Sequence, residues 1–272
     1  MSYFIIFILG LGFGSFANVC IYRIPRGESI IRPGSRCPGC GKPIKWYDNV
    51  PLISYAFLKG KCRYCGGKIS LQYPLIELIT AFIFLFTYQK FQGDPLTIVI
   101  FLILVLSLII VSTIDLQTHT IPDRFTYSLI ILGLSSSPFN SFLAQYGRII
   151  ITSPRWLSLI VSSLLGLVAG GGVLYLIALL GKGMFRREAM GGGDIKLISG
   201  IGVFLGAINV FWVIFLASLL GAITGGALRI AGKYKRFQEI AFGTYISLAT
   251  VLVFLFQPGF NRLYLDLVSL CR

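Results

Sequence analysis

Charged side chains are scarce in this chain of 272 residues. They make up 12% of it, whereas soluble globular domains usually carry about 25%. Hydrophobic residues make up 56%, and the mean hydropathy is +0.82. So little charge excludes an ordinary soluble protein and predicts an integral membrane protein. The length allows about eight spans of roughly 20 residues, which leaves little chain for domains outside the bilayer.

Acidic residues are the scarcest charged group, because ten Asp and Glu stand against 24 Lys and Arg. The net charge of +14 raises the question of nucleic-acid binding. Nineteen of the basic residues, however, lie in segments that would share one side of the membrane: 23–73, 115–124, 182–196 and 229–236. The positive-inside rule makes that side the cytoplasm. The charge therefore indicates topology, and we expect membrane lipid but no nucleic acid as a partner.

Apolar runs predict an all-α polytopic membrane protein with about eight transmembrane helices. They lie at about 3–22, 74–90, 96–114, 124–143, 156–181, 195–207, 209–230 and 240–257. The fourth is interrupted by Pro138, and the sixth is short. Glycines four residues apart, such as Gly10 with Gly14 and Gly166 with Gly170, predict close helix packing. The expected parts are a first helix (1–22), a polar cytoplasmic domain (23–73) and a transmembrane domain (74–272).

Four of the six cysteines form two pairs in the polar segment. Cys37 with Cys40 and Cys62 with Cys65 are CxxC motifs separated by 21 residues. This spacing predicts a zinc-ribbon-like domain in which four thiolates hold a structural Zn²⁺ and leave no open position for catalysis. Metal binding would fold a segment that has no sizeable core. Two disulfides are the alternative, which the expected cytoplasmic location disfavours.

Two aspartates stand out, because ionisable groups near a membrane are rare unless they have a function. Asp115 ends the third apolar run, and Asp194 follows the glycines 191–193 directly before the sixth. The charge distribution puts both at one boundary, where one carboxylate could activate water while a protonated partner polarises a carbonyl. Structural alternatives stay open, since Asp115 could mark the interface and Asp194 could cap the next helix. For Asp123, which follows Pro122, helix capping is the favoured interpretation.

Several longer motifs carry a resemblance to a known family. They are Gly14–Pro25, Trp46–Pro51, Tyr73–Glu77, Asp115 with the Ile-Pro-Asp at 121–123, and the segment Glu-Ala-Met-Gly-Gly-Gly-Asp-Ile-Lys at 188–196. In these residues the chain resembles, over nearly its full length, the bacterial type 4 prepilin peptidases. These are bifunctional leader peptidases and N-methyltransferases of the GxGD aspartic-protease group.

The resemblance implies an aspartic endopeptidase with Asp115 and Asp194 as its catalytic dyad. Its substrates would be prepilins of type 4 pili or pseudopilins of protein secretion, cut on the cytoplasmic side after a glycine that ends a short basic leader. It also implies N-methylation of the new N-terminal residue with S-adenosylmethionine as donor, whose binding residues the sequence does not identify. The implied location is the bacterial inner membrane.

Five further residues are candidates for the substrate or methylation site. Gly191 and Gly193 would leave the backbone beside the second aspartate open to an extended peptide. Glu188 and Lys196 flank the dyad, and Lys196 could contact lipid phosphate or a substrate carboxylate. Glu77, one turn into the second run, would meet water, a cation or the new ammonium group of the substrate.

Three other functions stay open. The nearest is a peptidase without methyltransferase activity. A multi-pass transporter would use the boundary carboxylates to handle cations, but it predicts internal repeats that the two halves do not display. A membrane assembly scaffold would use the zinc module for interaction alone. The choice of prepilin, the oligomeric state and the geometry of the dyad are not determined by the sequence.

Overall fold

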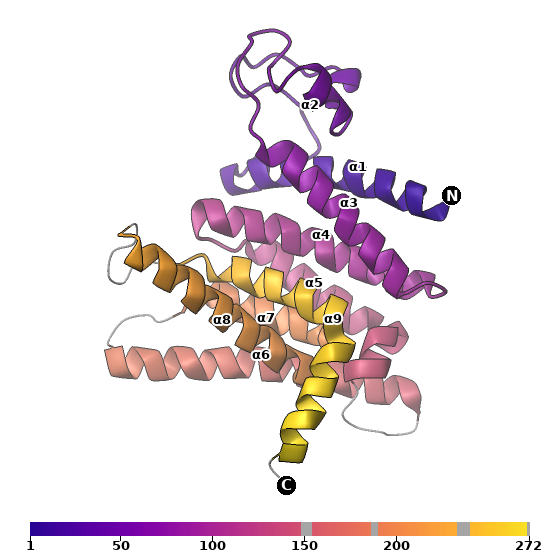
Figure 1. Cartoon of the computed structure of the whole chain (residues 1–272), viewed down its shortest axis with the longest axis vertical. Helices are drawn as coiled ribbons and strands as arrows, with labels where there is room; N and C mark the ends of the chain where they lie inside the picture. Colours follow the sequence, from indigo (N-terminus) through magenta and orange to yellow (C-terminus); the bar gives the residue numbers. More distant parts are fainter. Residues whose placement is uncertain (148–153, 186–189, 233–239, 271–272) are drawn as a thin grey trace. The chain divides into compact units, whose positions relative to one another are not determined.

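The computed structural model of the chain describes residues 1–147, 154–185, 190–232 and 240–270. Within these ranges the eight helices of 14 residues or more follow the eight predicted apolar runs (Figure 1). They are α1 (Ser2–Arg23), α3 (Gln72–Lys90), α4 (Pro95–Thr118), α5 (Asp123–Ser136), α6 (Arg155–Phe185), α7 (Gly192–Leu205), α8 (Ala207–Ile230) and α9 (Phe242–Leu270). A short helix, α2 (Ile53–Phe57), lies in the polar segment.

Five helices are long and apolar enough to cross a membrane: α1, α4, α6, α8 and α9. Helices α5 and α7 have 14 residues each, so they extend about 21 Å, less than the roughly 30 Å of a bilayer core. Helix α3 has 19 residues but is less apolar, because polar residues occupy both of its ends. The prediction of an all-helical, multi-pass membrane protein is thus confirmed, while the number of eight spans stays a prediction.

The fourth apolar run is broken at Pro138, as the sequence predicts. Helix α5 ends at Ser136 and a 3₁₀ turn (Ser137–Phe139) follows. The buried Asn140 then stabilises the break: its amide donates to the Phe204 carbonyl at 3.0 Å, and its oxygen accepts from the Leu143 N–H at 3.0 Å. Buried polar backbone groups that the break would leave without partners are satisfied in this way.

The chain forms two compact units, residues 1–93 with 101–110, and residues 94–100 with 111–272. In the first, α1 and α3 pack with their backbones in direct contact. A Cβ atom at Gly10 would lie 2.5 Å from the Cα of Ala81, and one at Gly14 would lie 2.6 Å from the Cα of Glu77. Only glycine fits at these two positions, which confirms the predicted close packing.

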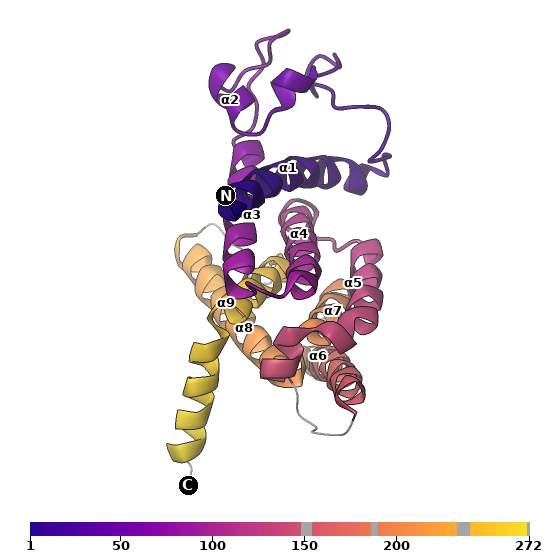
Figure 2. The same ribbon diagram turned by 90° about the vertical axis from the view of Figure 1, so that its right-hand side faces the viewer.

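In the second unit, α7 is the central helix. It packs against α5, α6, α8 and α9 (Figure 1 and Figure 2), and every residue from Leu197 to Leu205 is buried. Glycine again allows the closest approach, because a Cβ at Gly166 of α6 would lie 2.0 Å from the Gly202 carbonyl oxygen of α7. The buried body of α7 fixes the position of its N-terminal turn, which carries Asp194.

Candidate active site and metal centre

Asp115 lies in the last turn of α4 and is 4% exposed. Its Oδ2 atom accepts a hydrogen bond from the Thr244 N–H at 3.1 Å. The Thr244 hydroxyl lies 3.5 Å from the same oxygen and donates to the Ser112 carbonyl at 3.0 Å. Thr244 is in the first turn of α9, where N–H groups can bind an anion, and its N–H is shared between Asp115 Oδ2 and the Ala241 carbonyl, which lies 3.3 Å away. The N-terminus of α9 therefore holds the Asp115 carboxyl group.

Asp194 lies in the first turn of α7. The N-cap position of this helix is occupied by Gly191, and Asp194 is the third helical residue, from which a carboxyl group can reach back to the N-cap backbone, so the capping alternative stays open. Its carboxyl group interacts with the Gly191 backbone and with the charge of Asp115. Two carboxyl groups that are 79 residues apart in the sequence are thus brought near enough to interact electrostatically. The assignment of the two groups as a catalytic dyad stays a prediction.

Ile121, in the loop between α4 and α5, packs against glycines of two helices that meet at this site. A Cβ at Gly193 of α7 would lie 3.0 Å from the Cβ of Ile121. A Cβ at Gly243 of α9 would lie 2.7 Å from Ile121 Cδ1 and 3.0 Å from Asp115 Oδ2. Gly193 therefore makes room for Ile121, whereas Gly191 is exposed.

Sequence reasoning missed Ile121, Gly243 and Thr244. The available signal was the Gly-Thr pair at the start of the last apolar run, where the first helical turn offers free N–H groups. Nothing in that pattern indicates which carboxyl group the turn meets.

Lys196 forms an ion pair with Asp123, with Nζ 2.7 Å from Oδ1. The N-cap of α5 is Pro122 and Asp123 is its first residue, so the prediction that Asp123 caps the helix was wrong. Lys196 also lies 5.3 Å from the centre of the Tyr127 ring. Because both members of the pair are well exposed, its effect on stability is small. Glu188, the other predicted flanking residue, lies outside the described residues.

Glu77 is 7% exposed in the first unit. Its Oε2 atom accepts a hydrogen bond from the Leu52 N–H at 2.9 Å. Leu52 precedes α2 and has a φ of 59°, a conformation that a non-glycine residue adopts only when its surroundings hold it there. The carboxylate thus anchors the polar segment to α3, a role that the sequence did not suggest.

The sulfur atoms of the four paired cysteines lie within 4.8 Å of one another. Zinc–sulfur bonds of about 2.3 Å in a tetrahedron require sulfur atoms about 3.8 Å apart. The 3.9 Å between the Cys37 and Cys65 sulfurs fits this value and is far longer than the bond of about 2.05 Å in a disulfide. These cysteines are free thiols, so the cluster has the composition and spacing of a metal centre.

Both cysteine pairs form the same local turn. The N–H of Gly41 donates to the Cys37 carbonyl at 2.8 Å, and the N–H of Gly66 donates to the Cys62 carbonyl at 2.9 Å. Each glycine has a positive φ, 71° and 66° respectively, which favours glycine. Backbone N–H groups of Cys65 and Tyr64 lower the pKa of the Cys62 thiol to about 6. Against the lowering by the Gly67 backbone, hydrogen bonds with the other cysteines raise the pKa of the Cys65 thiol to about 11, so Cys62 is the member of this pair that ionises more readily.

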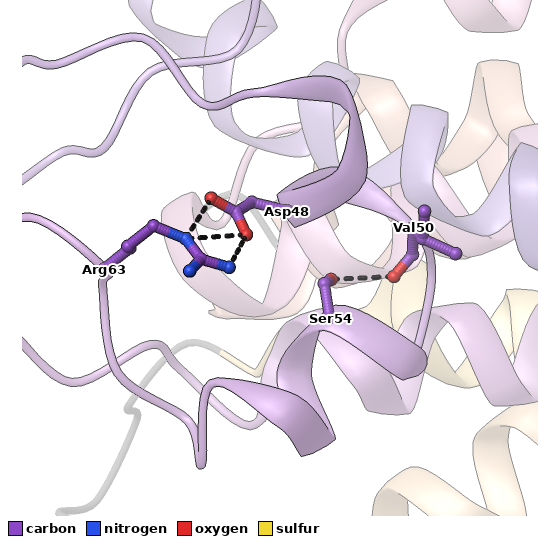
Figure 3. Close-up of polar contacts among 4 residues, drawn as sticks. All are labelled: Asp48, Val50, Ser54 and Arg63. Atoms are coloured by element: carbon purple, nitrogen blue, oxygen red, sulfur yellow. Dashed lines mark hydrogen bonds and ion pairs between the residues drawn. The ribbon is translucent and has the colours of Figure 1, made fainter.

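A bidentate ion pair braces the second cysteine turn. Arg63 donates from Nε and Nη2 to the Asp48 carboxylate over 2.6–3.1 Å, which lowers the pKa of Asp48 (Figure 3). The Ser54 hydroxyl donates to the Val50 carbonyl at 2.7 Å in the same view. The Asp48–Arg63 pair connects the 3₁₀ turn Trp46–Asn49 to the second cysteine turn, and the Ser54–Val50 bond joins α2 to the residue that follows the 3₁₀ turn.

An all-helical fold with five apolar helices, an interacting pair of carboxyl groups and a four-cysteine cluster defines a class: polytopic membrane proteins that carry a small metal-binding module. Comparison with known protein families identifies a narrower group within this class. Residues 8–91 match the Bacterial Peptidase A24 N-terminal domain, and residues 102–226 match the Type IV leader peptidase family.

Similar proteins named prepilin leader peptidase/N-methyltransferase occur in several bacteria. That of Bacillus subtilis is 34% identical, with 97% of this chain and 98% of that protein aligned. That of Neisseria gonorrhoeae is 32% identical, with 91% of this chain and 88% of that protein aligned. That of Myxococcus xanthus is 34% identical over 83% of this chain, and the alignment spans 63% of that longer protein. No solved structure matches the chain significantly. The chain belongs to the type IV leader peptidase family.

Proposed function

We propose that this protein cleaves prepilins or pseudopilins and methylates the new N-terminus, with Asp115 and Asp194 as the peptidase dyad. The observation that carries this proposal is that Ile121 packs both against Gly193, which precedes Asp194, and against Gly243, which lies beside Asp115 Oδ2. Relatives that align over most of this chain bear the names of both activities.

The dyad chemistry needs one ionised and one neutral carboxyl group. The carboxylate removes a proton from water as the water oxygen attacks the carbonyl carbon of the scissile bond, and the neutral acid gives its proton to the carbonyl oxygen. When the tetrahedral intermediate collapses, the carbon–nitrogen bond breaks, the leaving nitrogen takes up the proton that came from water, and a hydroxyl group of the intermediate returns its proton to the other carboxylate. The dyad then returns to its singly protonated state.

The substrate fits this location. A prepilin has a basic leader outside the bilayer and an apolar helix within it, so its cleavage site lies at the boundary between them. We place this boundary on the cytoplasmic side of the bacterial inner membrane, because the basic segments 23–73, 182–196 and 229–236 would share that side. The proposed organisation is a first helix (1–22), a cytoplasmic metal domain (23–73) and a peptidase domain (74–272).

The two cofactors have different roles in the proposal. Zn²⁺ would be bound by Cys37, Cys40, Cys62 and Cys65 and would supply folding free energy, since four thiolates complete its coordination. S-adenosylmethionine would supply the methyl group to the new N-terminal amine. Gly191, Gly193, Lys196, Glu188 and Glu77 stay candidates for the substrate or methylation site.

The test is mass analysis of a prepilin peptide incubated with the purified protein in detergent. We expect cleavage after the leader glycine, and a mass gain of one methylene group only when S-adenosylmethionine is added. Asp115→Ala and Asp194→Ala should abolish cleavage. Asp123→Asn is the matched control, since Asp123 is exposed and paired with Lys196.

The outcomes separate the alternatives. Cleavage without the mass gain would leave a peptidase alone. No cleavage by the unaltered protein, or cleavage that persists in both alanine variants, would contradict the proposed dyad and favour a transporter or a scaffold.

A further inference from the structure

The two dyad carboxyl groups have different hydrogen-bonding environments. Asp115 Oδ2 accepts from the Thr244 N–H at 3.1 Å, and the Gly243 N–H also points at this carboxyl group. The Thr244 hydroxyl is 3.5 Å away. For Asp194, the backbone contact is with Gly191. Asp115 therefore has the larger set of backbone donors.

Backbone N–H donors discriminate between the two protonation states of a carboxyl group. They stabilise the ionised form, since a carboxylate accepts hydrogen bonds at both oxygens. The helix dipole does not distinguish the two groups, because Asp115 meets the N-terminus of α9 and Asp194 lies in the first turn of α7. The difference comes from the hydrogen-bond donors, which act on Asp115 from α9, a different helix from the one that carries it.

The close approach of α9 depends on Gly243. A Cβ at this position would lie 3.0 Å from Asp115 Oδ2 and 2.7 Å from Ile121 Cδ1. A side chain here would push the helix terminus away from the carboxylate or displace the Ile121 side chain. The sequence Gly-Thr thus combines room for the carboxylate with donors directed at it.

We propose that Gly243 and Thr244, at the N-terminus of α9, position Asp115 as the ionised member of the dyad and leave Asp194 as the proton donor. This rests on the proposed function and assigns its two roles. Asp115 takes the proton from water, and Asp194 gives its proton to the carbonyl oxygen of the scissile bond. Gly243 and Thr244 are positioning residues, since they act through Asp115.

The acid limb of the pH–rate profile reports on this assignment. The titratable groups that face Asp115 in the described part of the chain are Asp194 from α7 and His119, the residue that follows α4. In a coupled pair the acid limb reports the first ionisation, which the proposal assigns to Asp115. Removal of a donor from Asp115 raises the pKa of that step and moves the limb to higher pH.

Thr244→Pro removes one N–H at a position where the helix tolerates proline, the first turn. Thr244→Val is its matched control, because it loses the same hydroxyl but keeps the N–H. With peptide cleavage as the readout, we expect the acid limb of kcat to move up by about one pH unit in Thr244→Pro, since a hydrogen bond to a charged group is worth about that much. We expect the acid limb of kcat in Thr244→Val to lie at the same pH as in the unaltered enzyme.

An unmoved limb in Thr244→Pro, or an equal shift in Thr244→Val, would overturn the assignment. If Thr244→Pro does not fold or is inactive at every pH, Gly243→Ala replaces it, with Gly172→Ala as control because a Cβ at Gly172 meets nothing within 4 Å. An upward shift of the acid limb in Gly243→Ala, without such a shift in Gly172→Ala, supports the proposal. Any other result rejects it. Failure of the unaltered protein to cleave would instead reject the proposed function.

Discussion

Replacement of Cys37 by serine tests the metal centre. The four sulfurs lie within 4.8 Å of one another, so each can bind a single ion. Structural zinc sites contribute about 10–16 kcal/mol, which is about 2.5–4 kcal/mol for each of four thiolates. Loss of one thiolate should therefore weaken zinc binding by about 10²–10³-fold.

The assay is the zinc content of purified protein after dialysis against graded concentrations of a chelator. We expect one Zn²⁺ per chain in the unaltered protein and release from Cys37→Ser at about 10²–10³-fold lower chelator concentration. Cys20→Ser is the control, because Cys20 is buried in α1 and is not part of the cluster.

Limited proteolysis gives a second readout of the same change. Metal loss should expose residues 24–71 to cleavage but leave α1 and α3 together, since their contact at Gly10 and Ala81 does not involve the metal. Equal zinc retention in Cys37→Ser and the unaltered protein would refute the assignment, as would a purified protein that binds no zinc and contains two disulfides.

Two predictions concern packing. Gly14→Ala should lower the thermal unfolding temperature in detergent, because its Cβ would lie 2.6 Å from the Cα of Glu77 and overpacking costs about 1–3 kcal/mol. Gly12→Ala, whose Cβ meets nothing within 4 Å, should have no such effect, and equal behaviour of the two would contradict the α1–α3 contact. Asn140→Ala should destabilise the protein by about 1–3 kcal/mol in chemical unfolding, because buried partners at Phe204 and Leu143 lose their hydrogen bonds. Ser135→Ala, at an exposed position, is the comparison, and a loss as large as that of Asn140→Ala would argue against this role of Asn140.

The orientation of α9 gives the site its asymmetry. Its first turn reaches Asp115, and Ile121 packs against Gly243 in the same turn. The same loop residue also packs against Gly193 beside Asp194. A single isoleucine therefore touches the helices that carry Asp194 and Thr244, so a change in its size should affect both carboxyl groups.

Local patterns in the sequence were sufficient for several features. Helices follow the apolar runs because a chain in a bilayer must satisfy its backbone hydrogen bonds internally. The break at Pro138 follows from a ring that cannot continue the helix. The cysteine cluster follows from two CxxC turns, whose geometry depends on adjacent residues. The glycine pair in α1 predicted close packing because small residues let helices approach.

Other features depend on residues that are distant in the sequence. Asp123 pairs with Lys196 instead of capping α5, and Glu77 accepts from the Leu52 backbone. Helix periodicity predicts on which face of a helix each residue lies. It does not predict which other segment of the chain packs against that face. Capping was therefore the better interpretation of Asp123 from local pattern alone, and it was wrong because Pro122 occupies the N-cap position and the Asp123 carboxylate pairs with a lysine 73 residues away.

The sequence by itself determined the membrane class, the helical segments, the metal-binding cysteines and the two aspartates as candidates, because each depends on composition or on spacing within a few residues. Only the tertiary structure decided that the N-terminus of α9 meets Asp115 and that Ile121 packs against Gly193 and Gly243. Those contacts join residues 72 to 129 positions apart in the sequence, for which the local pattern carries no signal. The physical difference is one of range: turns and helices follow from neighbouring residues, whereas the environment of a carboxyl group follows from the whole fold.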